Sequence, residues 1–161
     1  MISLLIKDQE LLDYTSALAK GLRGRFELAF RPDTAAPGLG GSIPSAGQCA
    51  ATSIVVQSIV GGKLASATVG GISHWFNRVP FRNRILDIDL TADQFGNKAV
   101  RIADANQLYK GTRERSMQDL TIETLLRATL LAHRAGFGDA ELKLKELLKE
   151  KFESQCFPVA R

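Results

Sequence analysis

The chain has 161 residues, of which 45% are hydrophobic and 24% are charged, and its formal net charge is +4. This composition is ordinary for a globular domain and excludes the disordered and fibrous classes. The length suits a single compact domain over residues 1–161, which can bury a core without disulfides or metal.

Membrane and export signals are not found in the sequence. No segment approaches the ~20 apolar residues of a transmembrane helix, and the first residues lack the basic region and cleavage site of a secretory signal. Cys49 and Cys156 lie far apart, which argues against a disulfide framework. We therefore expect a cytoplasmic protein with free thiols and no membrane partner.

The positive charge is spread along the chain rather than gathered in a stripe. Nucleic-acid binding requires a basic stripe with stacking aromatic side chains, or a recognised motif. Only the segment 75–84 combines aromatic residues with arginines, namely Arg78, Arg82 and Arg84. We interpret these as solvated arginines around a turn and expect no nucleic-acid partner.

The first elements are a helix and a long loop. Apolar residues at helical spacing predict a helix over 7–22, which Gly21 and Gly24 would end. The stripe comprises Leu11, Leu12, Thr15, Leu18 and Leu22. The loop 31–45 is rich in proline and glycine, and a loop of this length in a small domain is usually functional. Its glycine-rich part, 38–42, matches no nucleotide-binding motif, and we expect it to form a flexible lip over the site that follows.

The middle of the chain predicts a buried helix and an antiparallel sheet. Residues 49–60 contain no charged residue, and eight of the twelve are apolar. Their β-branched content also fits a strand, but the length and the alanines favour a helix. Alternation and glycine punctuation predict the strands that follow. These strands are 63–69, 72–79, 84–90 and a short one at 99–103, with a turn at 80–83.

The remainder of the chain is expected to be helical, so residues 112–154 form a C-terminal helical extension. Ser116 with Asp119 resembles a capping box before the first of these helices. Gly136 and Gly138 would end that helix, and Asp139 would cap the last one. Its apolar stripe comprises Leu144, Leu147, Leu148 and Phe152. If the chain forms a homo-oligomer, we expect the contact through these C-terminal helices.

The segment Gly47-Gln48-Cys49 at the start of the buried helix is the strongest chemical feature. A helix N-terminus stabilises a thiolate and offers backbone N–H groups to an oxyanion. Gly47 would let the backbone approach a substrate, and Gln48 can add a donor. The alternative is that Cys49 is a small buried apolar residue, which is the commoner fate of a free cysteine.

His74 and Asp89 complete the candidate site. Pairing Val79 with Arg84 across the turn places His74 opposite Asp89 and Phe76 opposite Asp87. A carboxylate beside an imidazole is the orienting partner that a general base needs. We therefore predict a triad in which Cys49 is the nucleophile, His74 the base and Asp89 the orienting carboxylate.

These motifs resemble those of transglutaminase-like and papain-like enzymes. Gly47-Gln48-Cys49 resembles their Gly-x-Cys at a helix start, His74-Trp75 their histidine strand, and Asp89-Leu90-Thr91 their Asp-x-Thr. The resemblance implies an α+β fold with a papain-like or transglutaminase-like core, in which the helix that begins at Cys49 packs on an antiparallel sheet. The segment between Cys49 and His74 is shorter than in most transglutaminase-like enzymes.

The run 47–95 is more closely similar to the YunG-like family of small bacterial proteins. The shared segments are Gly47-Gln48-Cys49-Ala50, the run 70–78 and the run 89–95. The run 47–95 is 49 residues long, so the resemblance covers about a third of the 161 residues. The helical tail after Gly111 has no counterpart in it. Membership of this family implies no particular activity.

The sequence thus predicts a cysteine-dependent enzyme that acts on amide or acyl bonds of a protein, peptide or small amide through a thioester. Peptidase, amidase, deamidase and acyl transferase activities share that intermediate. The alternative is a non-catalytic interaction module or effector domain that retains the fold. We expect no cofactor and no metal, because two histidines and two cysteines without paired spacing do not make a zinc site.

Overall fold

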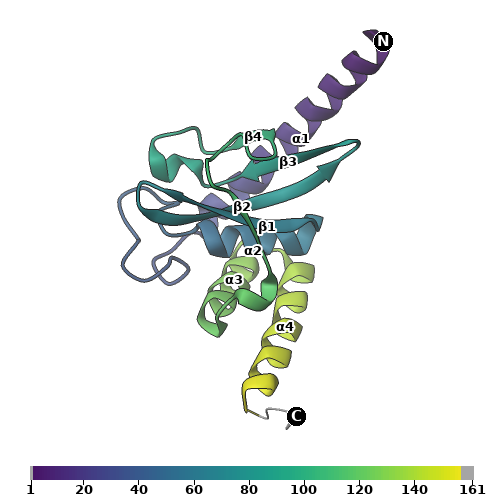
Figure 1. Ribbon diagram of the computed structural model, residues 1–161. Coiled ribbons are helices and arrows are strands. Elements are labelled where there is room, and N and C mark those ends of the chain that lie inside the picture. Colours follow the sequence, from purple (N-terminus) through teal and green to yellow (C-terminus); the bar gives the residue numbers. More distant parts are fainter. Residues whose placement is uncertain (1, 157–161) are drawn as a thin grey trace.

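The computed structural model describes residues 2–156 of the chain, with side chains for residues 9, 10 and 12–156. Four α-helices and five strands make up an α+β fold, shown in Figure 1. The helices are α1 (Ile2–Ala29), α2 (Cys49–Val60), α3 (Ile122–Arg134) and α4 (Gly138–Cys156). Two short 3-10 helices also occur, η1 (Ala92–Phe95) and η2 (Met117–Asp119).

The strands form one antiparallel sheet in the order β4-β3-β2-β1-β5. Their bounds are β1 (Lys63–Val69), β2 (Ile72–Phe81), β3 (Arg84–Asp89), β4 (Arg101–Asp104) and β5 (Arg113–Arg115). The two longest strands, β1 and β2, lie side by side at the centre. The sheet therefore presents the residues of β2 to the site from its middle rather than from an edge.

The two faces of the sheet pack differently. One face joins the helices in the main core, where Leu64 and Leu86 of the sheet pack with Ile54 of α2 and Leu125 of α3. Figure 1 shows α2 and α3 on the same side of the sheet. Alternate residues of β1 and β2 form a second, smaller cluster of Ala65, Ala67 and Phe76, which Tyr109 and Val69 partly cover. His74 and Asp89 have the alternation of Phe76, so the candidate site belongs to this second cluster.

The predicted helix 49–60 and strand 63–69 have the bounds that the sequence indicates, and Cys49 is the first residue of α2. The competing prediction of a strand at 49–60 is wrong. The helix is buried on nearly all sides, and this is why its sequence shows no polar face from which a helical period could be read. The residues that are 2% exposed or less include Ala51, Ile54, Val55 and Val56.

The first helix is longer than predicted, because α1 continues through Gly21 and Gly24 to Ala29. Each glycine costs a helix roughly 1 kcal/mol relative to alanine, but Phe26 and Ala29 beyond them are buried in the main core and offset that cost. The predicted stripe is correct for Leu12 and Leu22, whereas Leu18 is 53% exposed. Leu11 lies outside the described side chains.

The C-terminal part is not wholly helical. Residues 113–115 form β5, which pairs with β1 at the edge of the sheet. This strand is too short and too polar for alternation to reveal it. The capping box of Ser116 and Asp119 caps η2, while Thr121 caps α3. Asp139 lies inside the first turn of α4 rather than at its cap, and Phe152 of the predicted stripe is 59% exposed.

The register of the β2–β3 hairpin differs from the prediction by two residues. Phe81 pairs with Arg84, so the turn contains only Arg82 and Asn83, and Pro80 lies within β2. Arg82 has a positive φ of 54°, which a tight two-residue turn requires. An arginine in a sequence does not indicate a positive φ, so the turn could not be predicted from its residue type. Continuing this register places Phe76, not His74, opposite Asp89. A shift of two residues leaves every side chain on its predicted face.

A buried arginine joins α1 to the segment after β3. Arg23 is 4% exposed, and its guanidinium donates to both carboxylate oxygens of Asp93 at 2.8 Å and to the carbonyl oxygen of Leu90 at 2.8 Å. Asp93 also accepts a hydrogen bond from Ser45 Oγ at 2.6 Å. The first helix, the loop before α2 and the segment after β3 are therefore held together by one carboxylate.

We predict that Arg23→Ala lowers the free energy of unfolding by about 3 kcal/mol, because it leaves a partly buried carboxylate without its cation. The matched control is Arg84→Ala, which removes the exposed pair between Arg84 and Asp104 at 2.7 Å and should cost less than ~1 kcal/mol. Urea denaturation of the two variants measures both values. Equal losses would contradict the structural role of Arg23.

Candidate active site

Cys49 lies at the N-terminal end of α2 and is 7% exposed. The first backbone hydrogen bond of the helix runs from Thr52 N to Gln48 O at 2.9 Å, and no side chain caps the end. The N–H groups of residues 49–51 precede that bond, so the positive end of the helix surrounds the cysteine.

The turn before Cys49 depends on glycine. Gly47 has a φ of +73°, and a Cβ at this position would lie 3.1 Å from Leu39 Cβ and 3.2 Å from Ala35 Cβ. Its N–H donates to Gln94 Oε1 at 3.1 Å and its carbonyl oxygen accepts from Ala36 N at 2.8 Å. Gly47 therefore approaches the chain's own loop closely, and it is this contact, rather than a substrate contact, that the geometry shows.

Gln48 does not present a free donor in this structure. The residue is 1% exposed, and its Nε2 donates to the carbonyl oxygen of Arg31 at 2.8 Å. Its Oε1 is buried and has no hydrogen-bond partner among the described residues. The side chain expected to donate to an oxyanion is thus directed into the wall of the preceding loop.

His74 and Asp89 are in direct contact. His74 Nε2 and Asp89 Oδ2 are 2.7 Å apart, and both side chains have no exposed surface. The pair is diagonal across the β2–β3 ladder, since the register places Phe76 opposite Asp89. Diagonal neighbours remain within reach of a ring side chain, which is why the contact survives the difference in register.

Asp89 accepts hydrogen bonds from three residues. Oδ2 accepts from His74 and from Tyr109 Oη, the latter at 2.5 Å, and Oδ1 accepts from Thr91 N at 2.8 Å and Thr91 Oγ1 at 3.2 Å. Hydrogen bonds of this number replace the water that a buried carboxylate has lost, and they fix its orientation. Burial and the Asp89 carboxylate raise the pKa of Tyr109, so its hydroxyl keeps the proton that it donates.

Aromatic rings surround the imidazole. The ring of Phe95 stands edge-on to His74 with centroids 4.8 Å apart, and the ring of Tyr109 does so at 5.3 Å. The Phe76 ring lies beside the rings of His74 and Tyr109, and the Arg101 guanidinium lies over the Tyr109 ring. Sequence reasoning missed Tyr109, because nothing in its local sequence marks it and only the fold of the segment after β4 places it here.

Cys49 also lies near the imidazole of His74. Burial opposes the charged form of His74 and by itself lowers the pKa, but hydrogen bonding and charge interaction with Asp89 and Cys49 outweigh it and raise the pKa from 6.5 to about 9. Nε2 faces Asp89, and the other ring nitrogen, Nδ1, is buried and has no hydrogen-bond partner among the described residues. The structure thus shows direct contact between His74 and Asp89, with Cys49 near enough to influence the imidazole.

Asp87, the other aspartate of β3, has different partners. It accepts from Arg78 Nε at 2.8 Å, from Arg78 Nη2 at 3.0 Å and from Asn106 N at 2.8 Å. Arg78 is therefore not a solvated arginine, as the sequence suggested, but the partner of a fully buried carboxylate. The fold assigns Asp89 to the imidazole and Asp87 to a structural ion pair.

The remaining chemical residues lie elsewhere. Cys156 is exposed at the end of α4, and both cysteines are free thiols. His133 is largely exposed and contacts Glu141 at 3.1 Å. Within residues 2–156 no group of three or more His, Cys, Asp or Glu side chains is arranged to hold a metal ion, and no helix is long and apolar enough to cross a membrane.

Comparison with known proteins identifies the family. Residues 20–133 match the YunG protein family, so the chain belongs to that family. The matched range runs from the second half of α1 to the end of α3 and includes Cys49, His74, Asp89 and Tyr109. Searches of curated proteins and of solved structures found no significant match.

The raised pKa of His74 predicts a pH-dependent stability. A folded-state pKa above the unfolded value gives stability that is fully present below about pH 6.5 and is lost as the pH rises through about 9. The full effect is on the order of 3 kcal/mol. Thermal unfolding from pH 6 to pH 10 should therefore show a decline in the wild type that His74→Gln lacks. A decline of the same size in both proteins would contradict an imidazolium at this position.

Proposed function

We propose that this YunG family member is a cysteine-dependent enzyme that attacks an amide or acyl carbonyl and passes through a thioester. Cys49 is the nucleophile, His74 the base and acid, and Asp89 the carboxylate that orients the imidazole. A transglutaminase-like or papain-like core is part of the same proposal. The substrate class is a peptide, a protein side-chain amide or a small acyl compound.

One observation carries the proposal, namely that His74 contacts Asp89 through Nε2 rather than through Nδ1. Asp89 binds Nε2, which leaves Nδ1 free of any hydrogen bond among the described residues, and Cys49 is near the imidazole. An imidazolium beside a cysteine at a helix N-terminus favours the thiolate, which is the reactive form. A buried histidine with a purely structural role would also need a partner such as Asp89, but it would not need a cysteine at a helix N-terminus nearby.

The chemistry that these atoms permit is acyl transfer. The Cys49 thiolate attacks the carbonyl carbon, so that a C–S bond forms and the carbonyl electron pair moves to the oxygen. The pair then returns, the bond to the leaving amine or alkoxide breaks, and His74 supplies the proton that the leaving group takes. Water or an amine attacks the thioester next, gives its proton to His74 and releases the thiolate.

Stabilisation of the oxyanion falls to the backbone rather than to Gln48. The N–H groups of residues 49–51 have no acceptor within the helix and no side-chain cap, whereas the Gln48 amide is occupied by Arg31 O. Preorganised backbone donors of this kind contribute about 3 kcal/mol each to acyl transfer. Cys49 N and Ala50 N are therefore the donors that the proposal assigns.

A second candidate is a non-catalytic interaction module that retains the fold. The observation that favours it is the burial of the site, because His74 has no exposed surface and Cys49 is 7% exposed. In that case the Cys49–His74–Asp89 contact serves stability alone. The two candidates differ in whether the thiol is reactive in the folded protein.

Iodoacetamide at mildly acidic pH separates the two. Cys156 is exposed and Cys49 is buried, so exposure alone predicts faster alkylation of Cys156. If Cys49 is held as a thiolate, we expect it to react at least about tenfold faster than Cys156 below pH 7. Peptide mass mapping of a time course gives both rates in one sample.

His74→Ala provides the control for this measurement. It should remove most of the advantage of Cys49 while the rate of Cys156, which lies far from the imidazole, stays the same. If Cys49 is inert until the protein unfolds, it is a packed core residue and the enzyme proposal fails.

The two aspartates of β3 offer a matched pair of variants. Asp89→Asn should lower the alkylation rate of Cys49 by roughly an order of magnitude or more, because the amide favours the wrong tautomer of His74. Asp87→Asn weakens the ion pair with Arg78 and should reduce stability instead, with the rate little changed. Equal effects of the two variants on the rate would refute the assignment of Asp89 as the orienting residue.

A further inference from the structure

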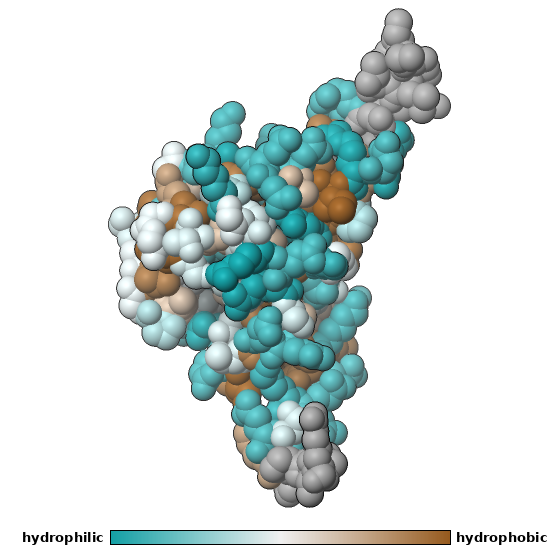
Figure 2. Space-filling view, in the orientation of Figure 1, coloured by the Kyte–Doolittle hydropathy of each residue, from teal (hydrophilic) through white to brown (hydrophobic). Residues whose placement is uncertain are grey.

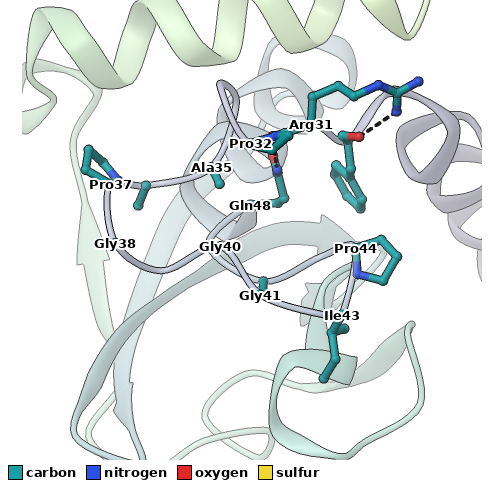
Figure 3. A pocket seen from close by; sticks show the side chains of 13 residues that line it. Arg31, Pro32, Ala35, Pro37, Gly38, Gly40, Gly41, Ile43, Pro44 and Gln48 are labelled. Carbon is teal, nitrogen blue, oxygen red and sulfur yellow. Dashed lines mark hydrogen bonds between the residues drawn. The ribbon is translucent and has the colours of Figure 1, made fainter.

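An open hollow of about 510 Å³ lies beside the residue that precedes Cys49. The loop between α1 and α2 forms most of its wall, and Figure 3 shows Gln48 on one side with Ile43 and Pro44 on another. Its apolar lining includes Phe30, Pro32, Ala35, Ile43 and Pro44. The volume is sufficient for a side chain or a small ligand.

The charge of the lining indicates a neutral occupant. Arg31 is the one charged residue among the described residues that line the hollow, and its Nη1 donates to the carbonyl oxygens of Phe30 at 2.6 Å and Leu28 at 3.2 Å. The guanidinium is thus folded back on its own chain. A carboxylate in the hollow would find no free cation, and an ammonium group would find no carboxylate.

A buried acceptor lies in the same wall. The amide of Gln48 is fixed by the bond from Nε2 to Arg31 O, and Arg31 also lines the hollow, while Gln48 Oε1 has no partner in the described part of the chain. A buried acceptor left unpaired costs about 1–3 kcal/mol. The oxygen has almost no exposed surface, so a ligand N–H group recovers that cost only where the Gln48 side chain moves toward the hollow to meet it.

The mouth of the hollow carries exposed apolar side chains. Ile43, which lines the hollow, is 39% exposed, and Leu39 of the same loop, which does not line it, is 41% exposed. Figure 2 shows hydrophobic and weakly polar residues gathered on the side of the molecule where Figure 1 places this loop, with further hydrophobic residues beside α1 and in the lower half of the view. Exposed apolar residues at a concave site mark binding surfaces.

We infer that this hollow binds the neutral apolar group of an amide substrate, and that the N–H two bonds from the attacked carbon donates to Gln48 Oε1. The inference rests on the proposed function, since Gln48 directly precedes the nucleophile Cys49. It narrows the substrate class to peptides or N-acylated compounds with an uncharged apolar group at this position. Acidic and basic groups are disfavoured there.

Haloacetamides test the inference, because their N–H also lies two bonds from the carbon that sulfur attacks. In each case the Cys49 thiolate displaces iodide and forms one S–C bond. The probes are iodoacetamide, N-(2-phenylethyl)iodoacetamide and the N-methyl derivative of the latter, which lacks the N–H. Cys156 in the same sample corrects for the intrinsic reactivity of each reagent.

We expect the phenylethyl reagent to alkylate Cys49, relative to Cys156, at least about tenfold faster than iodoacetamide does. The N-methyl derivative should lose most of this advantage. Ile43→Asp should lower the ratio of the phenylethyl rate to the iodoacetamide rate. The matched control is Leu142→Asp, at a 62% exposed apolar residue of α4, which should leave the ratio unchanged.

Equal relative rates of Cys49 with the phenylethyl reagent and with iodoacetamide would overturn the inference. So would a ratio that is the same in Ile43→Asp and Leu142→Asp. Failure of the proposed function has a different signature, because Cys49 would then show no preference over Cys156 even with iodoacetamide, and the inference would fall with it.

Discussion

The buried carboxylate of Asp89 is the group on which the site depends. It accepts hydrogen bonds from His74, Tyr109 and Thr91, and so it joins β2, the segment after β4 and the turn after β3. A buried charge is tolerated only where such partners replace water. His74 meets this requirement with Nε2, which lies 2.7 Å from Asp89 Oδ2.

The run 89–95, which begins with Asp89, also positions other parts of the site. After Asp89 and Thr91 it supplies Asp93, which binds Arg23 and Ser45, and Gln94, which accepts from Gly47 N. It ends at Phe95, whose ring stands edge-on to His74. One short segment thus fixes the imidazole and also the turn before Cys49, which explains why the Asp-Leu-Thr-x-x-Gln-Phe pattern forms a unit.

The sequence predicted those features that depend on local pattern. Alternation along β2 and β3 placed His74 and Asp89 on one face, and a two-residue difference in register could not change that. The register itself depended on the positive φ of Arg82, which its residue type does not indicate. Tyr109 and Arg23 could not be assigned roles, because each meets its partner only through the tertiary fold.

The stability of a buried charged group does not by itself explain this arrangement. A buried ion pair rarely stabilises a fold more than apolar side chains of the same volume would, and the aromatic rings around His74 show that the cluster has apolar surroundings. Yet the interactions with Asp89 and Cys49 keep the imidazole protonated near neutral pH, with a pKa of about 9. A cation beside a cysteine at a helix N-terminus is the arrangement that reactive cysteines use in general, and an apolar side chain in place of His74 would lack it. On the proposal that Cys49 is a nucleophile, this cluster serves the reactivity of the thiol rather than the stability of the sheet.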